Sequence, residues 1–332
     1  MGTGQVNWAG KRVLVTGAGG FIGSHLSERL AALGARTRCF VHYRADGSWG
    51  WLEEETGKRT LEVVAGDLTD RDCVLDAVRD CEIVFHLGAL IPIPYSYRAP
   101  LSFIRTNVEG TLNVLQAART CGVGRVVHTS TSEVYGTART VPITESHALQ
   151  AQSPYAASKI GADKIAEACH LSFGVPVVTV RPFNTYGPRQ SARAVIPTII
   201  TQCLTGGPVR LGNLDPTRDL NFVSDTVEGF IRAASVDQAV GHTVNLGSGR
   251  EISIRDLAHL IGSLVGKPLD VVADQERLRP AGSEVERLLA DNSKAASLLG
   301  WTPSVSLEEG LERTIEWIRH HLDRYRPDAY AV

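Results

Sequence analysis

Five polar side chains have the types and the spacing that proton transfer at a hydroxyl group requires. Thr131, Ser132 and Glu133 end an apolar, β-branched run, and Tyr155 and Lys159 follow on a predicted helix. Because residues i and i+4 lie on one face of a helix, the Lys159 ammonium can favour the Tyr155 phenolate and lower the pKa of the phenol. The pair suits oxidation of a hydroxyl group. The extra carboxylate suits a second proton abstraction from the oxidised product, unless it is an exposed strand-end group.

A glycine-rich turn near the start of the chain predicts a dinucleotide site. An apolar run at 13–16 leads into the glycines, and a helical segment at 24–30 follows. Backbone N–H groups of such a turn, together with the helix N-terminus, hold a pyrophosphate. The expected contacts are Gly17, Gly20, Phe21, Ile22 and Gly23.

The end of the second predicted strand carries no carboxylate. An acidic residue about 20 residues after the turn would bond the ribose 2′-hydroxyl of NAD. His42 and Arg44 stand in this region instead and can pair with a 2′-phosphate, so the sequence favours NADP over NAD. Asp67, followed by Leu68, is expected to bond the adenine amino group, or else to cap the helix beginning near Thr69.

Apolar runs alternate with helix-like segments through the first half of the chain. Further runs lie at 61–64, 83–87, 126–129 and 175–180. This alternation predicts an α/β fold with a doubly wound parallel sheet.

Beyond residue 181 the pattern changes, with dense prolines and glycines at 188–216 and helical periodicity at 254–265 and 307–322. We therefore expect two units. A dinucleotide-binding Rossmann domain would span 1–180 and be rejoined by about 223–248, and a smaller mixed α/β lobe would span 181–222 and 249–332.

Composition excludes several partners. The chain has 332 residues and a formal net charge of -2, so no broad basic field would recruit nucleic acid or an anionic membrane. Its six cysteines form no C-x-x-C pair, which favours free thiols in a reducing compartment. Without a leader-like segment or a membrane-length apolar run, the expected location is the cytoplasm. No metal-ligand spacing occurs.

Five motifs together resemble the extended short-chain dehydrogenase/reductase superfamily, in which nucleotide-sugar epimerases, dehydratases and decarboxylases share one Rossmann fold. The motifs are the glycine turn, His86-Leu87-Gly88-Ala89, Asn107-Val108-Glu109-Gly110-Thr111, Tyr155-x-x-x-Lys159 and Arg181-Pro182-Phe183-Asn184. The likeness covers nearly the whole chain. It implies that Leu87, Ala89, Asn107, Tyr155 and Lys159 join the cofactor site.

Other strings resemble narrower groups. The string at 131–136 is similar to the dehydratase and decarboxylase version of the superfamily. The strings at 91–97, 152–155 and 188–197 are similar to bacterial UDP-N-acetylglucosamine 4,6-dehydratases of the legionaminate type. The resemblance implies that these loops line the substrate pocket.

The resemblance also implies a reaction. Tyr155 would deprotonate the sugar C4 hydroxyl, with Thr131 bonded to the same oxygen, and Glu133 would remove the C5 proton before water leaves C6. Ser132 occupies a position where some dehydratases carry Asp, which leaves Glu133 as the candidate for the acid as well as the base. The implied substrate contacts are Tyr95, Asn184, Val195, Arg218 and Arg279, of which the two arginines would clamp the diphosphate or else form surface ion pairs.

The leading hypothesis is thus a UDP-N-acetylglucosamine 4,6-dehydratase with a tightly bound NADP or NAD. The alternatives are a UDP-glucuronate decarboxylase, a UDP-sugar 4-epimerase and a catalytically inactive NAD(P)-binding regulatory protein. Helices expected at 104–118 and from 155 to 168 each have an apolar face. These faces either pack on the sheet or join two subunits, and the relatives imply a homodimer.

Overall fold

A parallel sheet of seven strands forms the centre of the computed structural model, which describes residues 6–54, 61–267 and 269–325. The strand order is β10-β6-β5-β4-β1-β2-β3, and every neighbouring pair is parallel. The strands are β1 (Arg12–Thr16), β2 (Arg36–His42), β3 (Leu61–Gly66), β4 (Ile83–His86), β5 (Arg125–Thr129), β6 (Val177–Pro182) and β10 (Thr243–Leu246). This confirms the predicted doubly wound α/β fold. Its order reverses between β1 and β4, which is where such sheets bind ligands.

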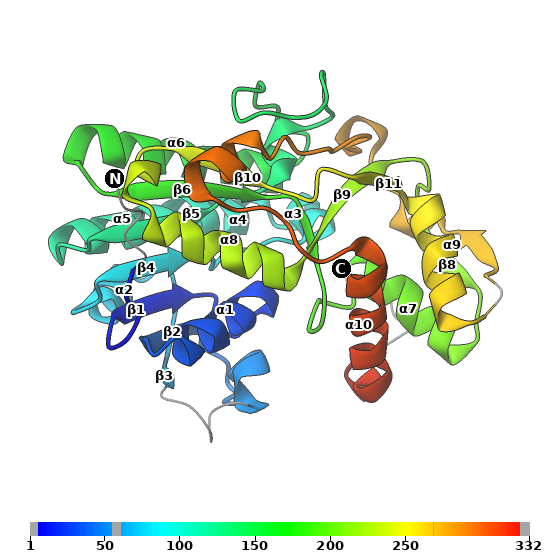
Figure 1. Cartoon of the computed structure of the whole chain (residues 1–332), viewed down its shortest axis with the longest axis horizontal. Helices are drawn as coiled ribbons and strands as arrows, with labels where there is room; N and C mark the ends of the chain where they lie inside the picture. The colour runs from blue at the N-terminus through cyan, green and yellow to red at the C-terminus, as the bar shows by residue number, and fades with distance from the viewer. Residues whose placement is uncertain (1–5, 55–60, 268, 326–332) are drawn as a thin grey trace.

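Helices cover both faces of this sheet (Figure 1). On one face α1 (Phe21–Ala32) contacts α8 (Val223–Ser235), and on the other α5 (Gly110–Thr120) contacts both α2 (Arg71–Val78) and α6 (Pro154–Phe173). Alternate residues of β1 supply the two cores. Val13 and Val15 pack in the cluster that holds α1, whereas Leu14 packs in the cluster that holds α5. Burial on both faces explains why the strands are continuous apolar runs.

A second group of elements lies at one end of the sheet, on the right of Figure 1. Its helices are α7 (Val195–Thr205), α9 (Ile254–Val265) and α10 (Leu307–His320), which contact one another. Two small sheets accompany them, built from β7 (Asn184–Tyr186), β9 (Thr217–Phe222) and β11 (Glu251–Ser253), and from β8 (Val209–Leu211) and β12 (Val271–Ala273). The boundaries between the two expected units stay a prediction.

Short helical segments shape the loops beside the sheet. The helix expected at 104–118 is a π-helical segment, η2 (Ile104–Glu109), that continues into α5, and α3 (Ile93–Arg98) and α4 (Pro100–Phe103) precede it. The remaining segments are η1 (Gly50–Glu54), η3 (Ser132–Tyr135), η4 (Asp237–Ala239), η5 (Gln275–Arg277), η6 (Ala281–Ser283), η7 (Ala295–Leu299) and η8 (Leu322–Arg324).

The alternative expectation that Asp67 caps a helix is wrong. Asp70 is the N-cap of α2 and accepts hydrogen bonds from the backbone N–H groups of Asp72 and Cys73. Asp67 instead accepts both the backbone N–H and the hydroxyl of Thr69, each at 2.8 Å. Asp67 thus stabilises the turn after β3, and Asp70, three residues later, starts α2.

All six cysteines are free. Over the three described ranges, no helix combines the length and the apolar character needed to cross a bilayer. The same ranges contain no group of three or more His, Cys, Asp or Glu side chains that could hold a metal ion.

Candidate active site

The glycine turn after β1 is shaped so that only glycine fits. Gly17 has a φ of 69°, and its carbonyl accepts the N–H of Gly20 at 3.0 Å. A Cβ atom at Gly23 would lie 2.2 Å from the Gly17 carbonyl oxygen. Gly20 is the N-cap of α1 and supplies no side-chain cap, so the first turn of the helix presents backbone N–H groups at Phe21 and Ile22. Such a terminus binds an anionic group.

The end of β4 lies against this turn, as binding across a switch point requires. A Cβ atom at Gly17 would lie 2.9 Å from the Cα atom of Gly88. Thr16 ties the two strand ends together, because its hydroxyl accepts the N–H of Gly88 at 2.9 Å and contacts His86 Nδ1 at 2.9 Å. Leu87 and Ala89 flank Gly88 and border the same turn. The residues present therefore fit a dinucleotide that spans β1 and β4.

The outer end of the predicted cofactor site is formed by the ends of β2 and β3. His42 Nδ1 lies 3.9 Å from Asp67 Oδ2, which brings these two predicted contacts together. Arg44 is half exposed and pairs with Asp46, with 2.6 Å between Nη2 and Oδ2. Leu68 is buried beside them. The guanidinium that would receive a 2′-phosphate therefore already has a carboxylate partner, with which the phosphate must compete.

Asn107 serves the protein backbone in this structure. Its side-chain oxygen accepts the N–H of Leu90, and its amide nitrogen donates to the Leu90 carbonyl and to the Ser158 hydroxyl. The predicted cofactor contact thus anchors the segment after β4 to α6, the helix that carries Tyr155 and Lys159. Its direct contact with the cofactor stays a prediction.

Tyr155 and Lys159 lie on the first turns of α6 and are buried. Ser153 starts the helix by accepting the N–H of Ala156, and Lys159 Nζ donates to the Thr129 carbonyl at the end of β5. Burial lowers the pKa of Lys159 to about 8, although the charge of Asp163 opposes this change. The ammonium and the phenol therefore share a site from which water is largely excluded.

The pKa of Tyr155 corrects one expectation. Burial raises it well above its ordinary value, a hydrogen bond from Thr131 lowers it, and the charge of Glu133 raises it again. The lowering expected from neighbouring residues is thus outweighed by desolvation. The positively charged nicotinamide ring of an oxidised cofactor would supply the opposing attraction when bound.

Glu133 lies near Tyr155, since its charge raises the pKa of the phenol. It lies on η3, whose cap is Thr131, and the Thr131 hydroxyl accepts the Glu133 N–H at 3.2 Å. Its side chain is buried, which rules out the exposed strand-end alternative, and its nearest cation is Arg279, at 4.0 Å between Nη1 and Oε2. Ser132, also on η3, is 2% exposed.

The two predicted phosphate-binding arginines converge on one carboxylate. Arg218 Nη2 lies 3.2 Å and Arg279 Nη1 lies 3.7 Å from Glu284 Oε1. Arg279 Nη1 is buried and has no hydrogen-bond partner within the described residues. Burial lowers the pKa of Arg218, and the charge of Glu133 opposes this. Both arginines thus border the space that Glu133 faces.

Three residues near this space were missed from the sequence. Tyr97 on α3 and Ser283 on η6 join the two sides of the site, with 2.5 Å between their hydroxyl oxygens. Glu284 is the third, and its backbone carbonyl accepts the side-chain amide of Gln152 at 2.9 Å. Tyr97 closes a string already singled out, but Ser283 and Glu284 carry no local signal because their partners lie far away in the chain.

The other predicted substrate contacts occupy separate walls. Tyr95 packs against Phe103, with ring centroids 6.0 Å apart, and Phe103 packs against Tyr155 at 6.3 Å. Asn184 begins β7, and its side-chain oxygen is buried without a hydrogen-bond partner among the described residues. Val195 begins α7. The structure therefore links Tyr95 to Tyr155 through the ring of Phe103.

Comparison with known proteins defines the class. The family model for GDP-mannose 4,6 dehydratase matches residues 14–314. The chain belongs to this family of nucleotide-sugar dehydratases, epimerases and decarboxylases, within the extended short-chain dehydrogenase/reductases that its motifs predicted.

Individual relatives catalyse different reactions. The chain is 35% identical to the UDP-glucose 4-epimerase of Mycolicibacterium smegmatis, over 93% of this chain and 99% of the relative. It is 34% identical to the UDP-N-acetyl-α-D-glucosaminuronate decarboxylase of Bacillus cytotoxicus, over 93% and 98%. A solved structure of DesIV, a dTDP-glucose 4,6-dehydratase from Streptomyces venezuelae with NAD and TYD bound, is 33% identical with a TM-score of 0.86, over 95% and 99% of the two chains. Overall similarity thus supports an NAD(P)-dependent enzyme without choosing its reaction.

The glycine cradle yields a direct prediction. Gly23→Ala places a methyl group against the Gly17 carbonyl, so the turn must open. We expect the dissociation constant for the dinucleotide to rise at least about tenfold, as measured by isothermal titration calorimetry. Gly207→Ala is the matched control, since its Cβ would meet nothing within 4 Å. Equal affinity in the two variants would show that the turn does not hold the pyrophosphate.

Proposed function

We propose that the protein is a nucleotide-sugar 4,6-dehydratase. Its substrate is a UDP-N-acetylhexosamine, namely UDP-N-acetylglucosamine, which it converts to the 4-keto-6-deoxy product. One observation carries the proposal: a buried carboxylate, Glu133, lies near enough to the Tyr155 phenol for its charge to raise the pKa of that phenol. A site of this kind can remove one proton from the C4 hydroxyl oxygen and a second from the neighbouring carbon, C5.

The first step is oxidation at C4. Tyr155 accepts the proton of the C4 hydroxyl, and Thr131, which bonds the phenol, holds the same oxygen. Lys159 stabilises the phenolate through its positive charge. A bound dinucleotide would supply the hydride acceptor for C4 and, in its reduced form, the hydride donor for C6, so no cofactor would be consumed over the cycle.

The second step distinguishes dehydration from the other reactions of the family. A C4 carbonyl acidifies the C5 proton, and Glu133 is placed to remove it. Glu133 then passes this proton to the C6 hydroxyl, which leaves as water. It takes a new proton from solvent and delivers it to C5 when hydride reaches C6, and Tyr155 releases the C4 hydroxyl proton to solvent. Decarboxylation of a 4-keto hexuronate releases carbon dioxide without C5 deprotonation, and 4-epimerisation leaves C5 untouched. We assign both the base and the acid role to Glu133, because Ser132 supplies no ionisable group.

Substrate binding follows from the remaining walls. Arg218 and Arg279 meet the diphosphate, because guanidinium groups pair bidentately with phosphate oxygens. Arg279 Nη1 has an unused donor for this purpose among the described residues. Asn184 also meets the phosphates, Val195 borders the base, and Tyr95 lines the sugar side. The choice of UDP-N-acetylglucosamine rests on the resemblance of the loops at 91–97 and 188–197.

A UDP-glucuronate decarboxylase is the second candidate. The donor of Arg279 that lies 4.0 Å from Glu133 suits a hexuronate carboxylate as well as a diphosphate, and a decarboxylase is among the similar proteins. A UDP-sugar 4-epimerase is the third, since an epimerase is equally similar, but it has no use for Glu133. An inactive NAD(P)-binding protein would not require Thr131, Tyr155 and Lys159 together.

We also propose that the protein is a homodimer joined through α5 and α6. Large apolar side chains are exposed near both ends of this helix pair, namely Leu101, Ile104, Leu171 and Phe173. Such side chains are favourable at a subunit interface. A sedimentation measurement tests this assembly directly.

The reaction is tested by incubating the purified protein with UDP-N-acetylglucosamine and UDP-glucuronate in heavy water. We expect the hexosamine to lose one water and to gain deuterium at C5, because Glu133 takes the proton that it delivers to C5 from the solvent. Mass spectrometry and proton NMR measure both changes. Carbon dioxide release from the hexuronate, or an isomer of unchanged mass, would replace the proposed reaction by one of the alternatives.

Glu133→Gln separates the two steps. We expect turnover to fall at least about a hundredfold, while the bound cofactor is still transiently reduced and C5 no longer exchanges with solvent. Stopped-flow absorbance of the reduced cofactor and deuterium incorporation measure the two steps. Glu312→Gln, which alters an exposed carboxylate on α10, is the control. Full turnover in the Glu133 variant would remove this residue from the mechanism.

Cofactor preference is tested at Arg44. We propose that NADP binds more tightly than NAD, because His42 and Arg44 replace the carboxylate that bonds a ribose 2′-hydroxyl. Arg44→Ala should weaken NADP binding about tenfold and leave NAD binding within about twofold. Arg36→Ala alters an exposed arginine at the opposite end of β2 and is the control. Similar affinities for NAD and NADP in the unaltered protein would contradict the preference.

A further inference from the structure

A buried carboxylate next to the reacting pair has no role in the reaction described so far. Asp163 lies one helical turn after Lys159 on α6 and is 5% exposed. Its two oxygens accept from three donors on or next to β5 and β6: His128 Nε2 at 3.1 Å, the Ser130 hydroxyl at 2.8 Å and Arg181 Nη2 at 2.9 Å. A carboxylate that collects so many donors inside the protein is kept charged.

The charge state of this cluster follows from its geometry. Burial raises the pKa of Asp163, but the hydrogen bond from His128 and the charges of Arg181 and Lys159 lower it below its ordinary value. Burial lowers the pKa of His128, so the imidazole is neutral and donates from Nε2. Arg181 is the permanent counter-ion. One negative charge therefore persists beneath Lys159 across the working pH range.

We propose that Asp163 is a positioning residue that keeps Lys159 protonated and aligns the segment bearing Thr131 and Glu133. On Lys159, Asp163 is the charge that opposes the effect of burial. The alignment acts through two contacts. Asp163 accepts a hydrogen bond from Ser130, the neighbour of Thr131. Its partner Arg181 also contacts Tyr135 at the end of η3, with 3.0 Å between Arg181 Nη1 and the Tyr135 hydroxyl.

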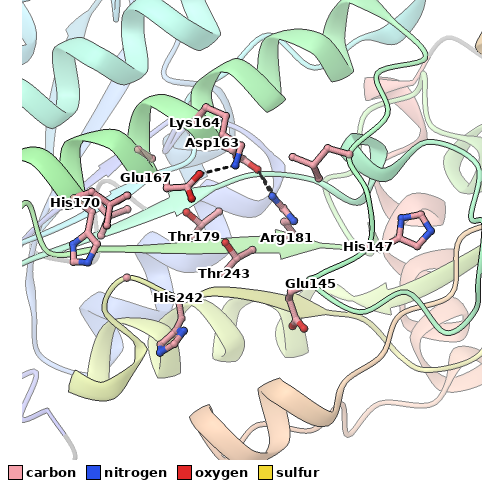
Figure 2. A pocket seen from close by; sticks show the side chains of 15 residues that line it. Glu145, His147, Asp163, Lys164, Glu167, His170, Thr179, Arg181, His242 and Thr243 are labelled. Carbon is pink, nitrogen blue, oxygen red and sulfur yellow. Dashed lines mark hydrogen bonds and ion pairs between the residues drawn. The ribbon is translucent and has the colours of Figure 1, made fainter.

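A cavity of about 350 Å³ reaches this ion pair from the side of α6, β6 and β10 (Figure 2). The Asp163–Arg181 contact forms its inner wall, and Glu167, His170 and Glu145 line the rest of it. Other charged or titratable groups nearby are Lys164, His147 and His242, which also line the cavity, and His86, which stacks on His128. Since the cavity groups are open to water, their charges are screened. The charge of Asp163 is buried and is therefore screened much less.

Removing the charge has a predictable sign. A carboxylate raises the pKa of both of its neighbours, and Asp163 affects Lys159 directly and Tyr155 through a weaker, longer-range interaction. Without it, both groups lose protons at lower pH, and Lys159 changes more. When the Tyr155–Lys159 pair holds a single proton, that proton then lies less often on Lys159 and more often on Tyr155. The equilibrium thus moves from phenolate and ammonium toward phenol and amine. Each pKa unit of relative change reduces the reactive form about tenfold.

The test measures the lysine directly. The chain has few lysines, Lys11, Lys58, Lys159, Lys164, Lys267 and Lys294, so ¹³Cε-lysine NMR resolves Lys159, with Lys159→Met assigning its signal. In the purified protein saturated with dinucleotide, Asp163→Asn should lower the pKa of Lys159 by about one unit. Glu167→Gln, which alters a half-exposed carboxylate one turn further along α6, should leave it unchanged. An identical Lys159 titration in Asp163→Asn and the unaltered protein overturns the proposal.

A kinetic measurement adds an independent readout. The pH dependence of transient cofactor reduction should move to lower pH in Asp163→Asn, and its plateau should fall about tenfold. A purely structural role would lower the amplitude without moving the pH dependence, and that result overturns the proposal. The lysine titration needs no sugar nucleotide. If UDP-N-acetylglucosamine is not a substrate, the proposed function fails while the titration still decides the role of Asp163.

Loss of one charge leaves Arg181 buried without a counter-ion, which can prevent folding. The double variant Asp163→Asn/Arg181→Gln removes both charges and avoids this problem. A folded double variant with a lowered Lys159 pKa supports the proposal. A folded double variant in which Lys159 titrates as in the unaltered protein overturns it.

Discussion

Excluding water from two groups that must both be charged is the constraint on which the site depends. Burial favours the neutral form of every ionisable group, so it raises the pKa of Tyr155 and lowers that of Lys159. Both changes oppose the phenolate and ammonium that proton transfer requires. Nearby charges must therefore stabilise the charged forms of both groups. The negative charge of Asp163 favours the ammonium of Lys159, and the cationic nicotinamide ring of a bound cofactor would favour the phenolate of Tyr155.

The parallel sheet places these groups within reach of one another. The carboxyl ends of β1, β4 and β5 lie side by side, because neighbouring strands are parallel and in register. The glycine turn therefore opens beside Gly88, and Thr131 follows the end of β5 directly. The opposite wall comes from the later part of the chain through Arg218, Arg279 and Glu284. A sugar nucleotide held between these walls would meet the cofactor with its hexose and the arginines with its diphosphate.

The sequence predicted those parts of the site whose physical cause is local. The Tyr155–Lys159 pair depends on helical periodicity, the glycine turn on backbone conformation, and the buried strands on continuous apolar runs. Contacts between distant segments had no such signal. Glu284 and Ser283 meet Arg218 and Tyr97 only after folding, and Asp163 resembles any polar residue on a helix until β5 and β6 surround it.

The same reasoning explains the expectations that changed. A pKa depends on solvent exclusion as well as on charged neighbours, and solvent exclusion cannot be read from an i, i+4 spacing. The phenol of Tyr155 is therefore harder to ionise than its lysine neighbour implied. Asn107 was assigned to the cofactor by its motif, yet its side-chain hydrogen bonds go to Leu90 and Ser158. The sequence motifs identified which residues lie near the site, and the structure shows which contacts each of them makes.

Glu133 also has an unfavourable effect on the first step of the reaction. Its negative charge raises the pKa of Tyr155. This hinders formation of the phenolate that takes the proton of the C4 hydroxyl in every reaction that begins by oxidation at C4. Two arginines offset part of that field, since Arg279 lies 4.0 Å from the carboxylate and the buried Arg218 interacts with it. An enzyme that only inverts C4 would react more readily with an uncharged residue in this place. A carboxylate that impedes the first step is consistent with a reaction whose second step requires a base, and dehydration between C5 and C6 is such a reaction.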